Sequence, residues 1–110
     1  MKKNVLIIAM LLLMPFFLKA DPPKKVNLSY QNGKLLIVVD HPVKNVNNHY
    51  INLISVSVNG KEVMVIKPTK QSSSQGETQE VVVPEIKPDC AVEVKAHCNR
   101  FGSKSAKLKL

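Results

Sequence analysis

Apolar and polar residues alternate along most of the chain after residue 20, and a period of two is typical of β-strands with one buried face. The segment 50–58 is a clear example, because Ile54, Val56 and Val58 alternate there with two serines. After residue 20, apolar residues do not recur at helical spacing between helix caps. The pattern predicts seven short strands, over residues 26–30, 34–39, 50–58, 62–66, 78–83, 91–97 and 105–110.

Turn residues separate these predicted strands. Asn59-Gly60 is the strongest hairpin signal, because both residues accept the positive φ of a type I′ turn. Gln31-Asn32-Gly33 is a turn between the first two strands. Pro42 ends the second strand, since proline has no N–H to give to a strand ladder. Polar stretches at 43–49 and 68–76 are predicted to be loops, the second of them flexible.

Seven short strands in about ninety residues predict one all-β domain over residues 21–110. The expected architecture is an immunoglobulin-like β-sandwich of about seven antiparallel strands, and a small barrel is the main alternative. The run 35–39 is apolar at every position, which predicts a strand covered on both faces. The sequence contains neither an internal repeat nor a linker between two domains.

Residues 1–20 have the pattern of a signal peptide. Lys2 and Lys3 precede a fourteen-residue apolar run, residues 5–18, which is shorter than the roughly 20 residues of a membrane-spanning helix. Ala20 is a small residue suited to the position before the cut, and polar chain begins at Asp21. The sequence therefore predicts a domain, residues 21–110, that is periplasmic or secreted and keeps no stable membrane span.

The distribution of charge argues against nucleic acid as a partner. The net charge of +8 falls to +5 once Lys2, Lys3 and Lys19 are removed, and Arg100 is the single arginine. Nucleic-acid-binding surfaces combine clustered basic residues with aromatic side chains for stacking, and this chain lacks both. The mild positive charge would instead steer a small anion toward the domain. The sequence leaves the oligomeric state open, a homo-oligomer included.

The two cysteines are too far apart to form a disulfide within one chain. Residues 91–97 between Cys90 and Cys98 alternate as a strand does, which places the two Cα atoms about 26 Å apart. A disulfide requires them within about 7 Å. Cys90 is left as either a buried thiol or a partner in a disulfide between chains.

Two histidines and one cysteine are the candidates for chemistry. A nucleophile-elbow motif and a glycine-rich phosphate loop are both lacking, which excludes the common hydrolase and nucleotide-binding patterns. His41 ends one predicted strand and His49 precedes the next, so one loop carries both imidazoles. The strand alternation places Cys98 on the apolar face and His97 on the opposite face. Two imidazoles and a thiolate suit iron, copper or zinc, although such residues taken singly are usually core or surface residues.

Four short segments together form a signature. They are His41-Pro42, His49-Tyr50-Ile51, Asn59-Gly60-Lys61-Glu62-Val63 and the run from Val92 through Cys98-Asn99 to Gly102. Over residues 35–110 this signature resembles the catalytic domain of superoxide reductases, the desulfoferrodoxin or neelaredoxin family. The resemblance implies an immunoglobulin-like sandwich that holds non-haem ferrous iron under four equatorial imidazoles and an axial thiolate. It also implies superoxide at the open sixth position and an electron donor that the sequence does not identify.

The resemblance assigns His41 and His49 as imidazole ligands and Cys98 as the thiolate ligand of the iron. Phe101 stands where the family has a further histidine, and no histidine precedes His41, so two of the five family ligands are missing. The Glu-Lys pair that assists catalysis in the family is missing as well. The resemblance therefore implies an exported iron-binding domain more firmly than it implies superoxide reductase activity.

Two further functions fit the same residues. The domain can be a metal-free binding module of the cell envelope. One such module, the scaffold subunit of the thiosulfate-oxidation carrier, has a similar His-Pro loop, a His-hydrophobic-Ile element and an Asn-Gly-Lys hairpin, and it binds a partner protein without metal. The run Glu-Val-Lys-Ala-His-Cys-Asn at residues 93–99 favours the superoxide reductase resemblance.

Overall fold

The computed structural model describes residues 21–110, so the predicted signal peptide, residues 1–20, lies outside the described residues. The described chain forms seven strands and no helix. The strands are β1 (Lys25–Gln31), β2 (Lys34–Asp40), β3 (Ile51–Val58), β4 (Lys61–Ile66), β5 (Gly76–Val81), β6 (Ala91–Cys98) and β7 (Ser103–Lys109). Every expected strand is present, and the all-β prediction is confirmed.

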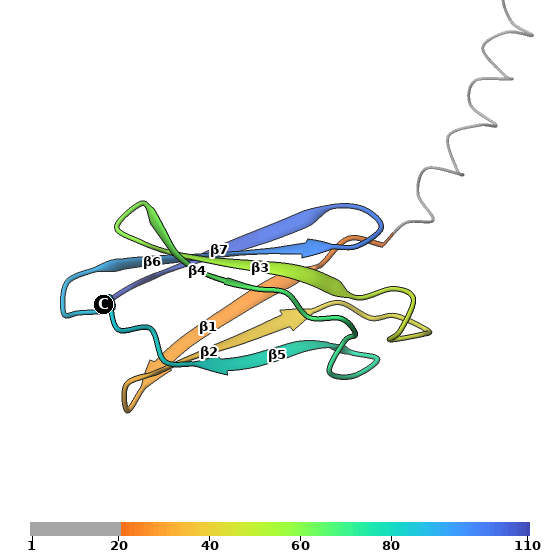
Figure 1. Ribbon diagram of the computed structural model, residues 1–110, viewed down its shortest axis with the longest axis horizontal. Coiled ribbons are helices and arrows are strands. Elements are labelled where there is room, and N and C mark those ends of the chain that lie inside the picture. Colours follow the sequence, from red (N-terminus) through yellow and green to blue (C-terminus); the bar gives the residue numbers. More distant parts are fainter. Residues whose placement is uncertain (1–20) are drawn as a thin grey trace, which may run out of the picture.

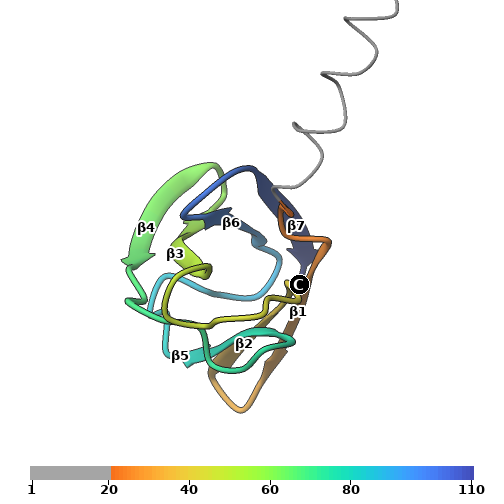
Figure 2. The ribbon, with the colours of Figure 1, turned by 90° about the vertical axis from the view of Figure 1, so that its right-hand side faces the viewer.

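The strands form two antiparallel sheets that face each other. One sheet has the order β1-β2-β5 and the other the order β4-β3-β6-β7. Figure 1 shows the two layers from the side, and Figure 2 shows them from one end. In the described part of the chain no strand pair joins one sheet to the other, which makes the fold an open sandwich rather than a closed barrel.

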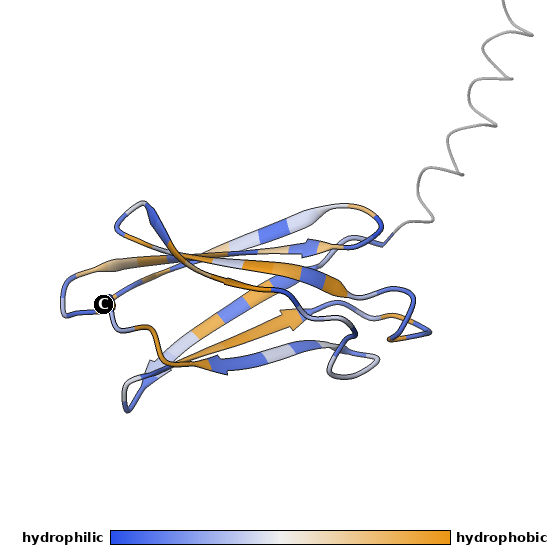
Figure 3. Cartoon of the chain, in the orientation of Figure 1, coloured by the Kyte–Doolittle hydropathy of each residue, from blue (hydrophilic) through white to orange (hydrophobic). Residues whose placement is uncertain are grey.

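The core lies between the sheets and is built by strand alternation. On β6, Val92, Val94 and Ala96 are buried, whereas Glu93 and Lys95 between them are exposed. Figure 3 shows the resulting concentration of hydrophobic residues on β2 and β3. The buried apolar cluster comprises Val26, Leu35, Ile37, Val39, Ile51, Ile54, Val56, Val58, Val83, Ile86, Cys90, Val92, Val94 and Ala96.

The expectation that β2 is covered on both faces is wrong. Leu35, Ile37 and Val39 are buried, but Leu36 and Val38 on the other face are partly exposed. The reason is that a two-layer antiparallel sandwich covers only one face of each sheet, and the other face meets solvent. The continuous apolar run therefore reflects β-propensity on the outer face as well as burial on the inner one.

Strand β5 begins two residues earlier than the sequence pattern predicts, because Gly76 is part of it. A side chain at position 76 would collide with the main-chain oxygen of Val39 on β2. Only glycine permits this close pairing, in which Gly76 lies opposite Asp40. The strand ends at Val81, and Val82 is 61% exposed in the connection that follows.

Four segments meet at one end of the sandwich, on the right in Figure 1. They are residues 21–24, the β2–β3 loop, the β4–β5 loop and the β6–β7 turn. The two hairpin turns lie at the opposite end. Asn59 and Gly60 have the predicted positive φ, and Asn32 and Gly33 have positive φ as well. Within residues 21–110, no helix is long and apolar enough to cross a bilayer.

Candidate metal centre

The β2–β3 loop brings His41 and His49 together. His41 directly follows β2, and His49 lies two residues before β3. The loop turns back on itself because the main-chain nitrogens of Asn48 and His49 both donate to the carbonyl oxygen of Asn45, at 3.2 and 3.0 Å. The two imidazole rings then meet edge to face, with centroids 4.8 Å apart and an interplanar angle of 86°. Both rings are buried.

A β-bulge at the start of β3 determines which side chains of this strand face the core next to Cys98. The register with β6 shifts between Ile51 and Leu53, so Asn52 is the extra residue. As a consequence Ile51 and Ile54 are both fully buried although they lie three positions apart. Ile51 is the pairing partner of Cys98, and this part of β3 therefore shares its buried face with the end of β6.

Cys98 is the last residue of β6 and points toward the core, as the sequence predicts. Its side chain follows the buried positions of β6, and His97 is half-buried on the other face. The main-chain N–H of Arg100 donates to Sγ at 3.4 Å, and the N–H of Cys98 donates to the carbonyl oxygen of Gly102 at 3.0 Å. The turn thus holds the sulfur in place and supplies it with one hydrogen bond, a contact of the kind that tunes metal-bound cysteine sulfurs.

Asn99 ties the end of β6 to the β2–β3 loop. Its main-chain N–H donates to the carbonyl of Tyr50 at 3.0 Å, and its side-chain oxygen accepts from the N–H of Tyr50 at 2.9 Å. Its side-chain nitrogen donates to the carbonyl of Asn48 at 3.0 Å. These three bonds flank His49 on both sides in the sequence, so they fix its position relative to Cys98.

The three residues that the sequence singles out lie close to one another. One donor atom from each of His41, His49 and Cys98 lies within 4.8 Å of the other two. Bonds from a transition metal to nitrogen and sulfur are about 2.0–2.3 Å long, so opposite ligands of one ion are at most about 4.6 Å apart. Shifts of a few tenths of an ångström would bring all three atoms onto one ion. Position and donor type both fit a transition metal.

One ring nitrogen of His49 is buried without a hydrogen-bond partner, which indicates a ligand that the described residues do not supply. Within the described residues its Nε2 atom is buried and has no hydrogen-bond partner, and the residue is 9% exposed. An unpaired buried polar atom costs about 1–3 kcal/mol of stability, which is why such atoms are rare. A metal ion bound to Nε2 would satisfy the atom.

Gln71, in the β4–β5 loop, orients the other imidazole. Its side-chain nitrogen donates to the carbonyl oxygens of His41 at 2.8 Å and Ser73 at 3.0 Å. Its oxygen must therefore face the ring of His41, whose Nδ1 donates to it at 2.7 Å, and it also accepts from the N–H of Ile51 at 3.2 Å. With its proton on Nδ1, a neutral ring presents the lone pair of Nε2, as metal-bound histidines commonly do, and the main-chain oxygen of Asp21 lies 2.9 Å from that nitrogen.

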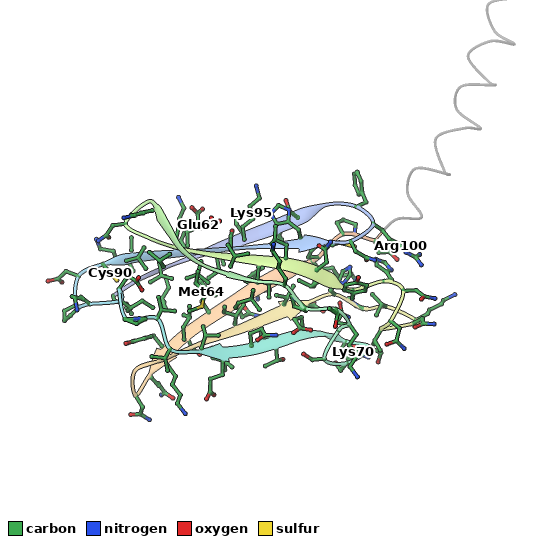
Figure 4. All side chains as sticks on the ribbon, in the orientation of Figure 1. Glu62, Met64, Lys70, Cys90, Lys95 and Arg100 are labelled. Carbon is green, nitrogen blue, oxygen red and sulfur yellow. The ribbon has the colours of Figure 1, made fainter. Side chains whose placement is uncertain are left out.

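An open cavity of about 770 Å³ leads from solvent to His49. Lys44 and Arg100 place two positive charges on its wall, and Asp21 places one negative charge there. Figure 4 shows Arg100 at this end of the molecule and Cys90 at the opposite end. The mouth of the site therefore carries a net positive charge, which favours the approach of a small anion.

No protein-family model and no curated protein sequence matches this chain. A solved structure is similar in fold. It is the crystal structure of a superoxide reductase in the oxidized state, with a TM-score of 0.48 and 14% sequence identity, covering 83% of this chain and 91% of that one. At such identity the chemistry of the site must be judged from the residues of this chain alone.

The remaining candidates lie outside the cluster. Phe101 is 60% exposed and does not line the cavity, whereas its neighbour Arg100 does. Cys90 and Cys98 are both free thiols, which agrees with the prediction that they do not pair. Cys90 is buried in the core as a small apolar residue.

The sequence analysis did not single out Gln71 and Asp21, which the structure places beside His41.

Burial lowers the pKa of His49 below its usual value of 6.5. When His41 is protonated, its charge lowers this pKa further, as does the charge of Arg100, and Asp21 opposes them in part. Burial and the nearby positive charges both disfavour the protonated ring, because it is poorly solvated here and is repelled by cations. The shift favours the neutral imidazole, which is the form that binds metals.

The lowered pKa predicts that the metal-free domain becomes less stable as the pH falls below about 6.5. The unfolded chain takes up the proton of His49 first, so protons favour unfolding until the lower folded-state pKa is reached. The contribution is fully present above 6.5, is lost as the pH falls to the folded-state pKa, and changes no further below it. Urea unfolding with a chelator present, between pH 7.5 and 5, measures this slope.

The control for this prediction is His97, whose ring lies on the outer face of β6. His49→Gln should flatten the pH dependence, whereas His97→Gln should leave the contribution of His49 in place. An unchanged slope in His49→Gln would show that another group is responsible.

Proposed function

We propose that this domain binds a redox-active transition metal, with iron as the first candidate, through His41 Nε2, His49 Nε2 and Cys98 Sγ. The observation that carries the proposal is the buried and unpartnered Nε2 of His49, a residue that has a ring nitrogen within 4.8 Å of a donor atom of His41 and of Cys98. A purely structural histidine would have its buried nitrogen hydrogen-bonded. Gln71 also supports the proposal, because its bond to Nδ1 leaves Nε2 of a neutral His41 ring, which lies beside the main-chain oxygen of Asp21, as the nitrogen that would bind the metal.

The donor set supports a reactive site rather than a purely structural one. Structural zinc sites are closed by four protein ligands, whereas this cluster offers three, one of which, His49, lines an open cavity. Two imidazoles and a thiolate accept iron, copper or zinc, and the sequence resemblance to superoxide reductases favours iron.

The substrate that we propose is superoxide, reduced in the cell envelope at the expense of an external electron donor. Bound ferrous iron would supply the single electron that, with two protons, turns superoxide into hydrogen peroxide. Lys44 and Arg100 would attract the anion to the cavity, and Pro42 on its wall would narrow the approach. Cys98, held by the β6–β7 turn, would contribute the negatively charged ligand.

Metal analysis tests the proposal. Residues 21–110, purified without oxygen and without a metal-binding tag, should take up about one Fe²⁺ per chain. At a hundred-fold excess over the dissociation constant, binding should stabilise the fold by about 2.7 kcal/mol. For a domain of this size, that corresponds to a rise in Tm of about 10 °C or more.

His49→Gln should lose this rise in Tm, and His97→Gln should keep it, because His97 faces away from the cluster. Preferential uptake of zinc or copper would support the site and contradict superoxide reduction by iron. If the wild-type domain takes up no metal after reconstitution, the proposal fails and the metal-free envelope module becomes the better explanation.

A further inference from the structure

The first described residues are fixed against the metal cluster. Pro23 is buried, and the N–H of Lys24 donates to the carbonyl oxygen of Asp40 at 2.8 Å, next to the end of β2. Pro22 packs on Gly102 so closely that a side chain at position 102 would collide with its ring. The segment is therefore held both by β2 and by the turn that follows Cys98, and Asp21 lies at the cavity.

The main-chain oxygen of Asp21 lies 2.9 Å from Nε2 of His41. Because Nδ1 donates its proton to Gln71, a neutral ring presents a lone pair at Nε2, and the carbonyl oxygen presents another lone pair to it. A cation shared by the two atoms, either a second ring proton or a metal ion, makes this contact favourable. Two adjacent ligands at a right angle on one ion, with bonds of about 2.1 Å, lie about 3.0 Å apart. The observed 2.9 Å is the spacing of neighbouring ligands and equally that of an N–H···O hydrogen bond.

We propose that the amino terminus released by cleavage after Ala20 completes the metal site, with the α-amino nitrogen and the carbonyl oxygen of Asp21 as two further ligands. This inference rests on the proposed function and on the predicted cleavage. The nitrogen and oxygen of one residue close a five-membered chelate ring with a metal ion. Together with His41, His49 and Cys98 they raise the donor set from three to five.

Cleavage changes the chemistry of the nitrogen. In the uncleaved chain the nitrogen of Asp21 belongs to a peptide bond, and its lone pair is delocalised into the carbonyl group of Ala20. After cleavage it is an amine and can donate its lone pair to the ion. The precursor should therefore bind the metal more weakly than the mature domain, so full metal affinity would arise only after export.

The test compares mature chains that differ only at the amino terminus. Every strand lies within residues 25–109, so a chain of residues 21–110 contains the whole described fold. One protein begins at Asp21 and a second keeps Ala20 in front of it, both released from a fusion partner by a protease that leaves no extra residue. The second protein retains the carbonyl and carboxylate groups of Asp21 and displaces only the amine.

Titration with Co²⁺, followed by the thiolate-to-metal absorption band and by competition with a chelator, measures the affinity. We expect the chain that keeps Ala20 to bind Co²⁺ at least about ten-fold more weakly. Asp21→Ala in the 21–110 chain should stay within about two-fold of wild type, because it keeps the amine and the carbonyl. Urea unfolding of the metal-free proteins verifies that the folds are equally stable.

The outcomes distinguish the proposed amino-terminal ligand from the proposed three-residue metal site. Equal Co²⁺ affinity with and without Ala20 would overturn the inference and leave the three-ligand site standing. A loss in Asp21→Ala as large as that caused by Ala20 would identify the carboxylate as the ligand and also overturn it. A mass spectrum of the exported protein that shows a start other than Asp21 would have the same effect. Failure of all three proteins to bind Co²⁺ and Fe²⁺ would instead contradict the proposed function.

Discussion

Cys98→Ala should abolish the thiolate-to-metal absorption band of the reconstituted domain and lower its metal affinity at least about a hundred-fold. The sulfur is the single anionic donor of the cluster, so its loss removes both a ligand and the charge that offsets the metal ion. The band arises from electron transfer out of the thiolate and has no other source among the three donors. Absorption spectra and competition titrations with Fe²⁺ and Co²⁺ measure the two effects.

Cys90→Ala is the matched control for this experiment. Cys90 is also a buried free thiol, but it lies at the opposite end of the sandwich, as Figure 4 shows. Both substitutions remove one buried sulfur and should lower the free energy of unfolding by a similar amount, about 1 kcal/mol. Only Cys98→Ala should change the spectrum. A band that persists in Cys98→Ala would rule out Cys98 as the ligand, and a band that also disappears in Cys90→Ala would show that its loss is not specific to Cys98.

Strand alternation explains why so much of the fold could be predicted from the sequence. A residue on a sandwich strand faces either the core or solvent, so a period of two records burial directly, as it does from Val92 to Cys98. Turn chemistry supplies the breaks, because Asn59-Gly60 has few conformations other than a tight hairpin. The same reasoning did not place Gly76 in a strand, because glycine in a polar segment predicts a loop. Only the structure shows that Gly76 approaches the main chain of Val39 closely.

The same local logic singled out the three members of the candidate metal cluster, although it did not by itself assign them as ligands. His41 and His49 flank one loop, and the parity of β6 turns Cys98 inward, so each position follows from its neighbours in the sequence. Their meeting also depends on the extra residue at Asn52, which reverses the side-chain alternation of β3. No pattern in the sequence marks that bulge.

Gln71 and Asp21 could not be predicted, because their roles depend on contacts between distant parts of the chain. The bond between Gln71 and His41 spans thirty residues, and the contact between Asp21 and His41 spans twenty. Each residue lies in a polar stretch whose local composition indicates only a loop or an extended segment. Burial of a polar side chain is a property of the assembled fold, and it becomes visible only there.

Gln71→Leu should lower the free energy of unfolding by about 3 kcal/mol or more and weaken metal binding at least about ten-fold. The side chain is 2% exposed and makes four hydrogen bonds, to His41 Nδ1, the N–H of Ile51 and the carbonyls of His41 and Ser73. Leucine fills a similar volume but leaves these buried groups unpaired, at about 1–3 kcal/mol for each one that water does not reach. Urea unfolding measures the loss.

Gln75→Leu, in the same loop, is the control for a change in polarity alone, because its side chain is exposed. It should leave both stability and metal affinity within experimental error. Equal effects of the two substitutions would show that the loop tolerates no leucine. The hydrogen bonds of Gln71 would then not explain the loss of stability and metal affinity.

Gln71→Glu separates orientation of the imidazole from stability of the fold. A carboxylate still accepts from His41 Nδ1 and from the N–H of Ile51, but it can no longer donate to the carbonyls of His41 and Ser73. We therefore expect Gln71→Glu to be destabilised and yet to bind metal about as tightly as wild type, because carboxylate–histidine–metal arrangements keep the ring aligned. If instead Gln71→Leu binds metal normally while Gln71→Glu does not, the proton on Nδ1 has no part in presenting Nε2 to the metal. The inferred tautomer of His41 would then be wrong.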